Sequence, residues 1–220
     1  MKWILVLAFA LAGLPQIVRA QEVSEATAAP DMAYLTEEEK VARDVYEAFA
    51  KKYQQRVFEN IARSEQHHLD KMSELLTTCG KDIPRTVRKD KPGRFDSPEL
   101  QELYQSLLAR GEQSLEEALR VGALIEETDI LDLRAAAAGA ECTEAAALYA
   151  RLEKASYNHL RAFVRNLGKQ GVTYEPVLLA QKDYADILAQ EPFRGEGHGK
   201  GHGQAGGKGH GKNKQKKHRG

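Results

Sequence analysis

The sequence is poor in the features that define several common protein classes. Only 2 of its 220 residues are cysteine, so the chain can form at most one intramolecular disulfide. No stretch alternates apolar and polar residues with a period of two, which argues against a β-sheet. The apolar run at residues 3–14 is too short to be a convincing membrane span. What remains is helical periodicity along most of the chain.

The N-terminus has the composition of a secretory signal. Lys2 precedes the apolar run, and the sequence Val18-Arg19-Ala20 resembles the small-residue ending that a signal peptidase cleaves. We therefore expect residues 1–20 to be a signal peptide and the mature protein to be secreted or periplasmic, with no transmembrane segment. An uncleaved membrane anchor is the alternative.

The formal net charge of zero hides a strong asymmetry. Residues 194–220 are rich in Gly, His and Lys and carry eight Lys or Arg against one acidic residue, whereas residues 21–193 contain 22 basic and 31 acidic residues. Because this tail has almost no apolar surface to offset the entropy of ordering, we expect it to be disordered. Its histidines could bind metal ions, its lysines favour contact with a polyanion, and a purely solubilising extension is the third interpretation.

Residues 30–190 have the length of one domain and a helical pattern. Ser114 with Glu117 forms a capping box, and Ser97-Pro98 is a typical helix start. The expected helices span residues 36–53, 58–78, 98–111, 114–138, 143–167 and 181–188. The sequence therefore predicts an all-α fold, a four-helix bundle with a long crossover between its second and third long helices and an extra short helix in that crossover.

Each of the four long helices interrupts its apolar stripe with ionisable residues. These residues are Glu39; Glu65 and His68; Glu126 and Asp129; and His159. One buried charge is costly, and four carboxylates that converge in a bundle core would repel one another strongly unless cations lay among them. Two divalent cations would balance the four acids, and neutral histidines would complete the coordination. The pattern therefore predicts a dimetal carboxylate site.

The same residues carry a resemblance to known proteins. The segments "EKVARDVY", "EQHH" and "EETD" resemble the ligand motifs of ferritin-like, rubrerythrin-type bundles. More closely, the blocks "LTEEEKVARDVY", "NIARSEQHHLDKM", "VGALIEETDILDL" and "NHLRAFVRNL" resemble the ferritin-like bacterial family known as DUF2202, over most of residues 33–190. This resemblance implies a dinuclear centre of iron or manganese that supports oxidase, ferroxidase or peroxide-reducing chemistry.

One position departs from the ferritin-like pattern. Such proteins usually carry Glu-x-x-His on the fourth helix, but "SYNH" places Ser156 three residues before His159. Asp129, one turn beyond Glu126, would then supply the missing acid. The departure favours three alternatives: a single metal ion, a metal other than iron, or a non-catalytic metal-binding bundle. A structural bundle whose function lies in the tail is a further alternative.

Several predicted ligands also fit ordinary structural roles. Glu39 could be the capping-box partner of Thr36 at a helix start. Glu65 and His68 could form a surface pair on a rotated helix, although apolar residues share their face. His159 alone could be a hydrogen-bonded core histidine. The agreement of all four helices favours the metal site.

Three neighbours of the predicted ligands are placed by helical periodicity. His67 and Glu127 fall with charged residues on the outer faces of their helices, so we expect both to be solvated. Tyr46 shares the stripe of Glu39 and is expected to be a core residue, with a redox or hydrogen-bonding role as the alternative.

The two cysteines fit the geometry of a crossover bundle. Cys79 lies 14 residues beyond Glu65, and Cys142 lies 16 residues beyond Glu126, so both should be at a similar distance from the metal layer. We therefore predict a Cys79–Cys142 disulfide, which an exported protein permits. Two free thiols are the alternative.

Overall fold

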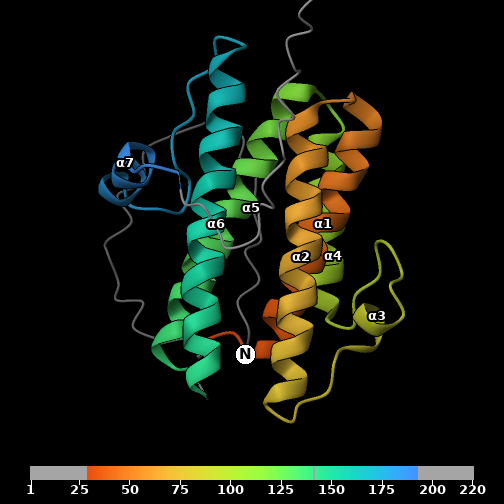
Figure 1. The fold of residues 1–220 in the computed structure, drawn as a ribbon. Coiled ribbons are helices and arrows are strands. Elements are labelled where there is room, and N and C mark those ends of the chain that lie inside the picture. The colour runs from red at the N-terminus through yellow and green to blue at the C-terminus, as the bar shows by residue number, and fades with distance from the viewer. Residues whose placement is uncertain (1–28, 141, 193–220) are drawn as a thin grey trace, which may run out of the picture.

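The computed structural model describes residues 29–140 and 142–192, and this part of the chain is helical and contains no strand (Figure 1). Its helices are α1 (Met32–Tyr53), α2 (Arg56–Thr78), α3 (Arg85–Arg88), α4 (Pro98–Gly111), α5 (Leu115–Ala138), α6 (Thr143–Gly168) and α7 (Gln181–Ala189). The predicted all-α class is confirmed. The predicted signal peptide and tail lie outside the described residues. None of the described helices is long and apolar enough to cross a membrane.

The four long helices pack as two pairs, α1 with α2 and α5 with α6 (Figure 1). Contacts of α1 with α5 and of α2 with α6 join the pairs into one bundle. The crossover between α2 and α5 carries α4, which packs on α1 and α5, as well as the short α3, which packs on α1 and was not predicted. The final helix α7 packs on α6.

The start of α1 differs from the prediction. Asp31 caps this helix, because its side chain accepts a hydrogen bond of 2.8 Å from the backbone N–H of Tyr34. Thr36 lies inside the helix, where its hydroxyl donates to the carbonyl of Met32. The predicted start at Thr36 is therefore wrong, and Glu39 lies too far along α1 to be a capping residue. By contrast, Ser114 caps α5 as predicted, accepting from the N–H of Glu117 at 3.0 Å.

The bundle core contains two apolar clusters. One contains an aromatic group in which the Phe58 ring lies 5.5 Å from that of Phe49 and 5.8 Å from that of Phe163. Gly122 allows this close packing, because a Cβ atom there would lie 2.5 Å from the Phe163 ring. The other cluster is mainly aliphatic and includes Met72. Along α1, α2 and α6, the buried residues of one cluster come before the predicted ligands and those of the other cluster come after them. The predicted ligands therefore lie between the two clusters.

Candidate metal centre

The structure brings five of the predicted ligands together at one level of the bundle. All five are buried, with at most 8% of the surface of any of them exposed. They are Glu39 of α1, Glu65 and His68 of α2, Glu126 of α5 and His159 of α6. Each long helix therefore contributes at least one ligand candidate, and the surface-pair alternative for Glu65 and His68 is wrong.

These residues form two groups that share one carboxylate. In the first, Nδ1 of His68 lies 2.6 Å from Oε2 of Glu65 and 3.3 Å from Oε2 of Glu39. In the second, Nδ1 of His159 lies 2.8 Å from Oε1 of Glu65 and 3.3 Å from Oε2 of Glu126. The ligand atoms of each group lie within 4.8 Å of one another. Glu65 thus directs one oxygen toward each group, which is the geometry of a bridging ligand.

Three of the central atoms have no hydrogen-bond partner outside the two ligand groups. They are Oε1 of Glu65, Nδ1 of His68 and Nδ1 of His159, and all are buried. Within the groups these atoms lie at ion-pairing distance from one another. Convergent donor atoms of this kind fit a cation between them.

The charges at the centre shift one another's pKa values. Burial raises the pKa of Glu39 to about 7, against the opposing effect of His68. Burial also disfavours the charged form of Glu65, but His159 and His68 outweigh it and hold its pKa below the ordinary value. Burial lowers the pKa of His159, but Glu65 and Glu126 outweigh it and raise the value to about 10. In the absence of a metal ion, protonated histidines balance the carboxylates.

Two further side chains hold the ligands from outside. The hydroxyl of Ser64 lies 3.0 Å from Nε2 of His159 and 3.4 Å from Nε2 of His68, so one oxygen contacts both rings. The hydroxyl of Tyr46 donates to Oε1 of Glu126 at 2.6 Å. Sequence analysis missed Ser64, although its place one turn before His68 on the same helix could have indicated the contact. Tyr46 is buried as predicted, and the structure adds its hydrogen bond.

Asp129 lies beside the centre and belongs to neither ligand group. Ser156 donates a short hydrogen bond to Oδ2 of Asp129 and also contacts the carbonyl of Leu152 at 3.0 Å. Burial and the nearby carboxylates of Glu39 and Glu126 raise the pKa of Asp129 well above its ordinary value. The serine that replaces the expected fourth-helix acid therefore holds Asp129 in place.

The two residues that were expected to be solvated, His67 and Glu127, differ in their exposure to solvent. His67 is exposed, as predicted. Glu127 is fully buried, and its carboxylate accepts hydrogen bonds from the Tyr174 hydroxyl at 2.6 Å and from the backbone N–H groups of residues 177, 178 and 179. The prediction for Glu127 is wrong because the segment between α6 and α7 folds over this face of α5 and supplies the donors.

The two cysteines meet where the predicted disulfide would form. Cys79 follows α2, Cys142 precedes α6, and their sulfur atoms lie 2.6 Å apart. Both cysteines are free thiols in the structure. The disulfide therefore stays a prediction, and the structure satisfies its requirement that the two sulfurs be neighbours.

The fold and the site define a helical bundle with a buried centre of carboxylates and imidazoles. Residues 29–191 match the family described as "Uncharacterized protein domain (DUF2202)", and the chain belongs to this family. It is 40% identical over 161 residues to "Uncharacterized protein MJ0754" of Methanocaldococcus jannaschii, a match that covers 73% of this chain and 86% of that protein. The crystal structure of hypothetical protein MJ0754 is similar with a TM-score of 0.71 and 36% identity, covering 83% of this chain and 100% of that chain.

Proposed function

We propose that this protein is an exported, ferritin-like metal-binding protein that holds two ions of iron or manganese side by side between its long helices. The proposed ligands are Glu39, Glu65, His68, Glu126 and His159, with Asp129 as an adjacent acid. The observation that carries the proposal is the pair of ligand groups that share Glu65. Three carboxylates and two imidazoles are oxygen and nitrogen donors of the kind that suit these metals.

The convergent atoms support the fit of this site to metal ions. Two imidazole nitrogens and one carboxylate oxygen point into the same buried region and have no hydrogen-bond partner outside the ligand groups. Once the histidines are deprotonated, these atoms would be left without partners unless a cation lay among them. The site has instead the composition of a dinuclear carboxylate centre, in which facing helices contribute carboxylates and histidines.

When bound, such a pair of ions supplies redox chemistry toward oxygen or peroxide. The residues of the chain hold and orient the ligands. With metal bound at Nδ1 of each histidine, Nε2 would carry the remaining proton, and the two lone pairs of the Ser64 oxygen could accept both N–H groups. Tyr46 fixes Glu126 through its hydroxyl, and the aromatic cluster beside it excludes water.

A non-catalytic metal-binding protein is the second candidate, and Ser156 favours it. A second bridging carboxylate from α6 would sit at this position, but the hydroxyl of Ser156 is used to hold Asp129. Glu65 would then be the one carboxylate shared by the two ligand groups, and fewer negative charges would stabilise oxidised ions.

An oxidation assay separates the two candidates. The full chain is loaded with iron(II) without oxygen, and oxygen or peroxide is then added while iron oxidation is followed by absorbance. Oxidation faster than that of free iron(II), lost in Glu126→Gln, supports the redox protein. Stoichiometric binding without faster oxidation supports the second candidate. If the chain binds no iron or manganese, both candidates fail.

For the N-terminus we propose a cleaved export signal, and for the C-terminal tail a binding role. Cleavage after residue 20 would place the protein outside the cytoplasm, and N-terminal sequencing of the exported protein tests it. The tail at residues 194–220 would contact polyanions through its lysines or metal ions through its histidines. A synthetic peptide of the tail distinguishes these roles, because polyanion binding weakens with salt whereas metal binding weakens on acidification.

A further inference from the structure

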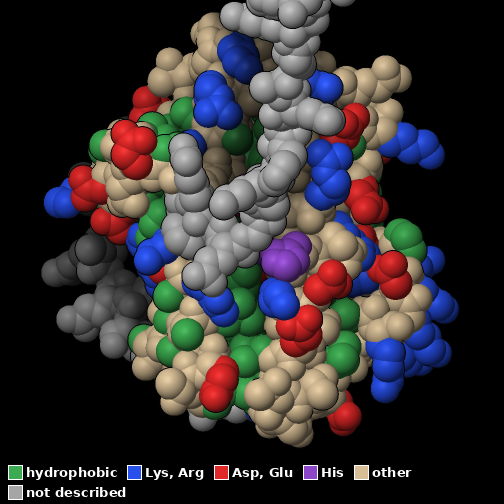
Figure 2. Space-filling model, viewed as in Figure 1, with side chains coloured by type: hydrophobic (Ala, Val, Ile, Leu, Met, Phe, Trp, Pro, Cys, Tyr) green, Lys and Arg blue, Asp and Glu red, His purple; other side chains and the backbone are tan. Residues whose placement is uncertain are grey.

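The crossover between α2 and α5 forms a cation-lined crevice far from the metal centre in sequence. Figure 2 shows Lys and Arg side chains gathered at one edge of the molecule, where Figure 1 places α3. The crevice has a volume of about 330 Å³. Its lining includes Arg85, Lys89, Lys91 and Arg94, together with Phe95. This concentration of positive charge contrasts with the rest of the domain, which is acidic overall.

The positive charges of the crevice are mostly unpaired. Asp96 is the one acid in the lining; it accepts a hydrogen bond of 3.2 Å from the N–H of Thr86, and its other oxygen lies 3.8 Å from Nε of Arg85. In the described part of the chain, the charged ends of Lys89, Lys91 and Arg94 form no ion pair or hydrogen bond. The crevice therefore presents cations without intramolecular partners.

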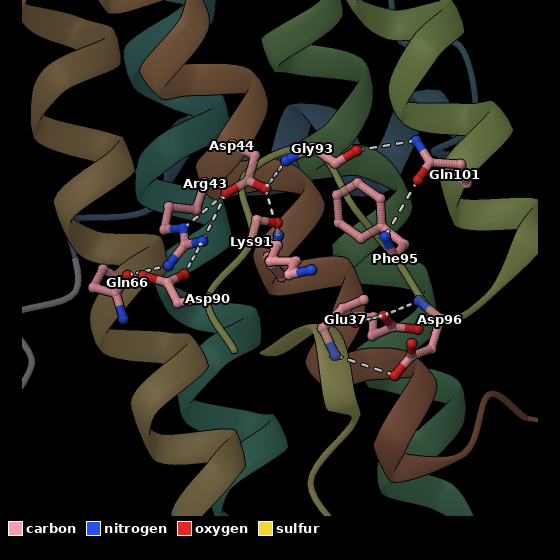
Figure 3. Close-up of polar contacts among 12 residues, drawn as sticks. Glu37, Arg43, Asp44, Gln66, Asp90, Lys91, Gly93, Phe95, Asp96 and Gln101 are labelled. Carbon is pink, nitrogen blue, oxygen red and sulfur yellow. Dashed lines mark hydrogen bonds and ion pairs between the residues drawn. The ribbon is translucent and has the colours of Figure 1, made fainter. Parts of the chain in front are cut away.

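Buried contacts fix one wall of the crevice on α1 (Figure 3). Nζ of Lys40, which is fully buried, donates to the carbonyl of Lys91 at 2.7 Å and pairs with Asp44. The same oxygen of Asp44, Oδ2, also accepts a hydrogen bond from the N–H of Gly93 at 2.7 Å. Gly93 has a positive φ of 66°, which suits glycine. These contacts hold the backbone that carries the lysines.

A second anchor fixes the opposite wall. The carboxylate of Glu37 accepts hydrogen bonds from the N–H groups of Asp96 and Ser97, at 2.6 and 2.9 Å, and from the hydroxyl of Thr86. Because both walls are fixed before any ligand arrives, binding requires little further ordering of the backbone.

We propose that this crevice binds the phosphate group of a small molecule. A phosphate carries up to two negative charges and more acceptor oxygens than a carboxylate does, so it can engage several guanidinium and ammonium groups at once. The limited volume suits a pyrophosphate or a phosphate ester. A long nucleic acid would extend past the crevice onto the acidic faces of the domain, which would repel it.

The test uses the full chain, treated with a chelator to remove metal ions, and inorganic pyrophosphate as the probe in calorimetric titrations. The variant Lys89→Gln/Arg94→Gln removes two crevice cations that make no internal contact. The matched control Lys51→Gln/Arg151→Gln removes one lysine and one arginine that are exposed elsewhere. Both variants retain the tail, so any binding to the tail is the same in all three proteins. Thermal melts confirm that the variants fold.

We expect the crevice variant to bind pyrophosphate at least about tenfold more weakly than wild type, and the control to change by less than about twofold. Equal binding by all three proteins, or no binding by wild type, overturns the proposal. A DNA duplex that binds wild type more tightly than pyrophosphate does, with the same loss in the crevice variant, also overturns it and assigns the surface to nucleic acid.

Discussion

Glu126 and Glu127 are consecutive residues of α5, both are buried, and they face different regions of the molecule. Glu127 faces the segment between α6 and α7, where a tyrosine hydroxyl and three backbone N–H groups donate to it. Glu126 faces the bundle centre, where Tyr46 donates to it and Nδ1 of His159 lies 3.3 Å from its other oxygen. The sequence places both acids on one helix turn, but only their partners distinguish an anchor from a ligand.

The same contrast separates the metal centre from the crossover anchors. Glu37 and Asp44 are buried and accept hydrogen bonds from backbone N–H groups of the crossover, so they hold a segment with little regular structure against α1. Glu39, between them on α1, faces His68 and Glu65 instead. These three acids of α1 thus have two kinds of surroundings: Glu37 and Asp44 are hydrogen-bonded to a loop, and Glu39 faces the candidate ligands.

The largest effect should follow from removing two ligands. Glu65→Ala/His68→Ala removes the shared carboxylate and one imidazole, so we expect no tight manganese or iron binding in a calorimetric titration of the full chain. The matched control His67→Ala/Glu74→Ala removes the same residue types from the exposed face of α2 and should bind as wild type does. If the control lost metal binding equally, the buried residues of α2 would not be the ligands that distinguish the proposed site.

The next prediction concerns a covalent link between Cys79, at the end of α2, and Cys142, at the start of α6. A disulfide between Cys79 and Cys142 would close a loop of about 60 residues and contribute about 4 kcal/mol to the free energy of unfolding, which a reductant would remove. Denaturant melts with and without reductant measure the difference. Mass spectrometry after alkylation is the control, and two alkylated thiols in exported protein without reductant would contradict the prediction.

Single substitutions of Glu126 and Glu127 test the comparison between these two buried acids directly. Glu127→Gln puts amide hydrogens against backbone N–H donors, so we expect a loss of about 2–3 kcal/mol in the free energy of unfolding with metal binding retained. Glu126→Gln should weaken metal binding and cost the metal-free protein less stability than Glu127→Gln does, because it leaves no backbone N–H group without an acceptor. Denaturant melts and metal titrations of both variants measure these effects. If Glu127→Gln lost metal binding and Glu126→Gln caused the larger loss of stability, Glu127 would be the ligand and Glu126 the anchor.

Ser64 supports the ligands without binding metal. Ser64→Ala removes the acceptor of both imidazole N–H groups, so metal affinity should fall by about 10–100-fold. The control Ser73→Ala lies on the same helix and loses only a hydrogen bond to the carbonyl of Leu69. Nitrogen NMR of the histidine rings provides a separate readout, since the loss of the Nε2–H tautomer should accompany the weaker affinity. An unchanged affinity would show that packing alone positions the rings.

We expect the smallest effect from a change of pH, which alters the stability of the metal-free protein and its affinity for metal ions. The raised pKa values of Glu39, about 7, and His159, about 10, mean that their protonated forms stabilise the metal-free fold. This stabilisation is complete below the ordinary pKa of each group and is lost as the pH rises through about 7 for Glu39 and about 10 for His159. Metal ions replace these protons, so affinity should rise by up to about tenfold per pH unit for each proton released.

Titrations in buffers of different ionisation enthalpy measure the released protons. The melting temperature of metal-free protein should fall between about pH 6 and about pH 9, while the stabilisation by added manganese grows. An affinity that does not change with pH would mean that the bound groups are already deprotonated, in conflict with the shifts of both residues.

The sequence predicted the long helices and the inward position of the five central residues, because both follow from helical periodicity. Residues such as Glu65 and His68 lie on an apolar stripe, and this pattern is local. The buried state of Glu127 could not be predicted in the same way, since its donors come from a segment about fifty residues away. The burial of Lys40 and Glu37 likewise depends on how the crossover folds back onto α1.

Metal analysis of the chain lacking residues 194–220, purified from cells supplied with iron and manganese, tests the central claim most directly. Without the histidine-rich tail, any tightly bound metal must belong to the helical domain. The account predicts two metal ions per chain, and a lower melting temperature once a chelator has removed them. A chain without stoichiometric metal, or one whose stability does not change with the chelator, would contradict a dinuclear centre.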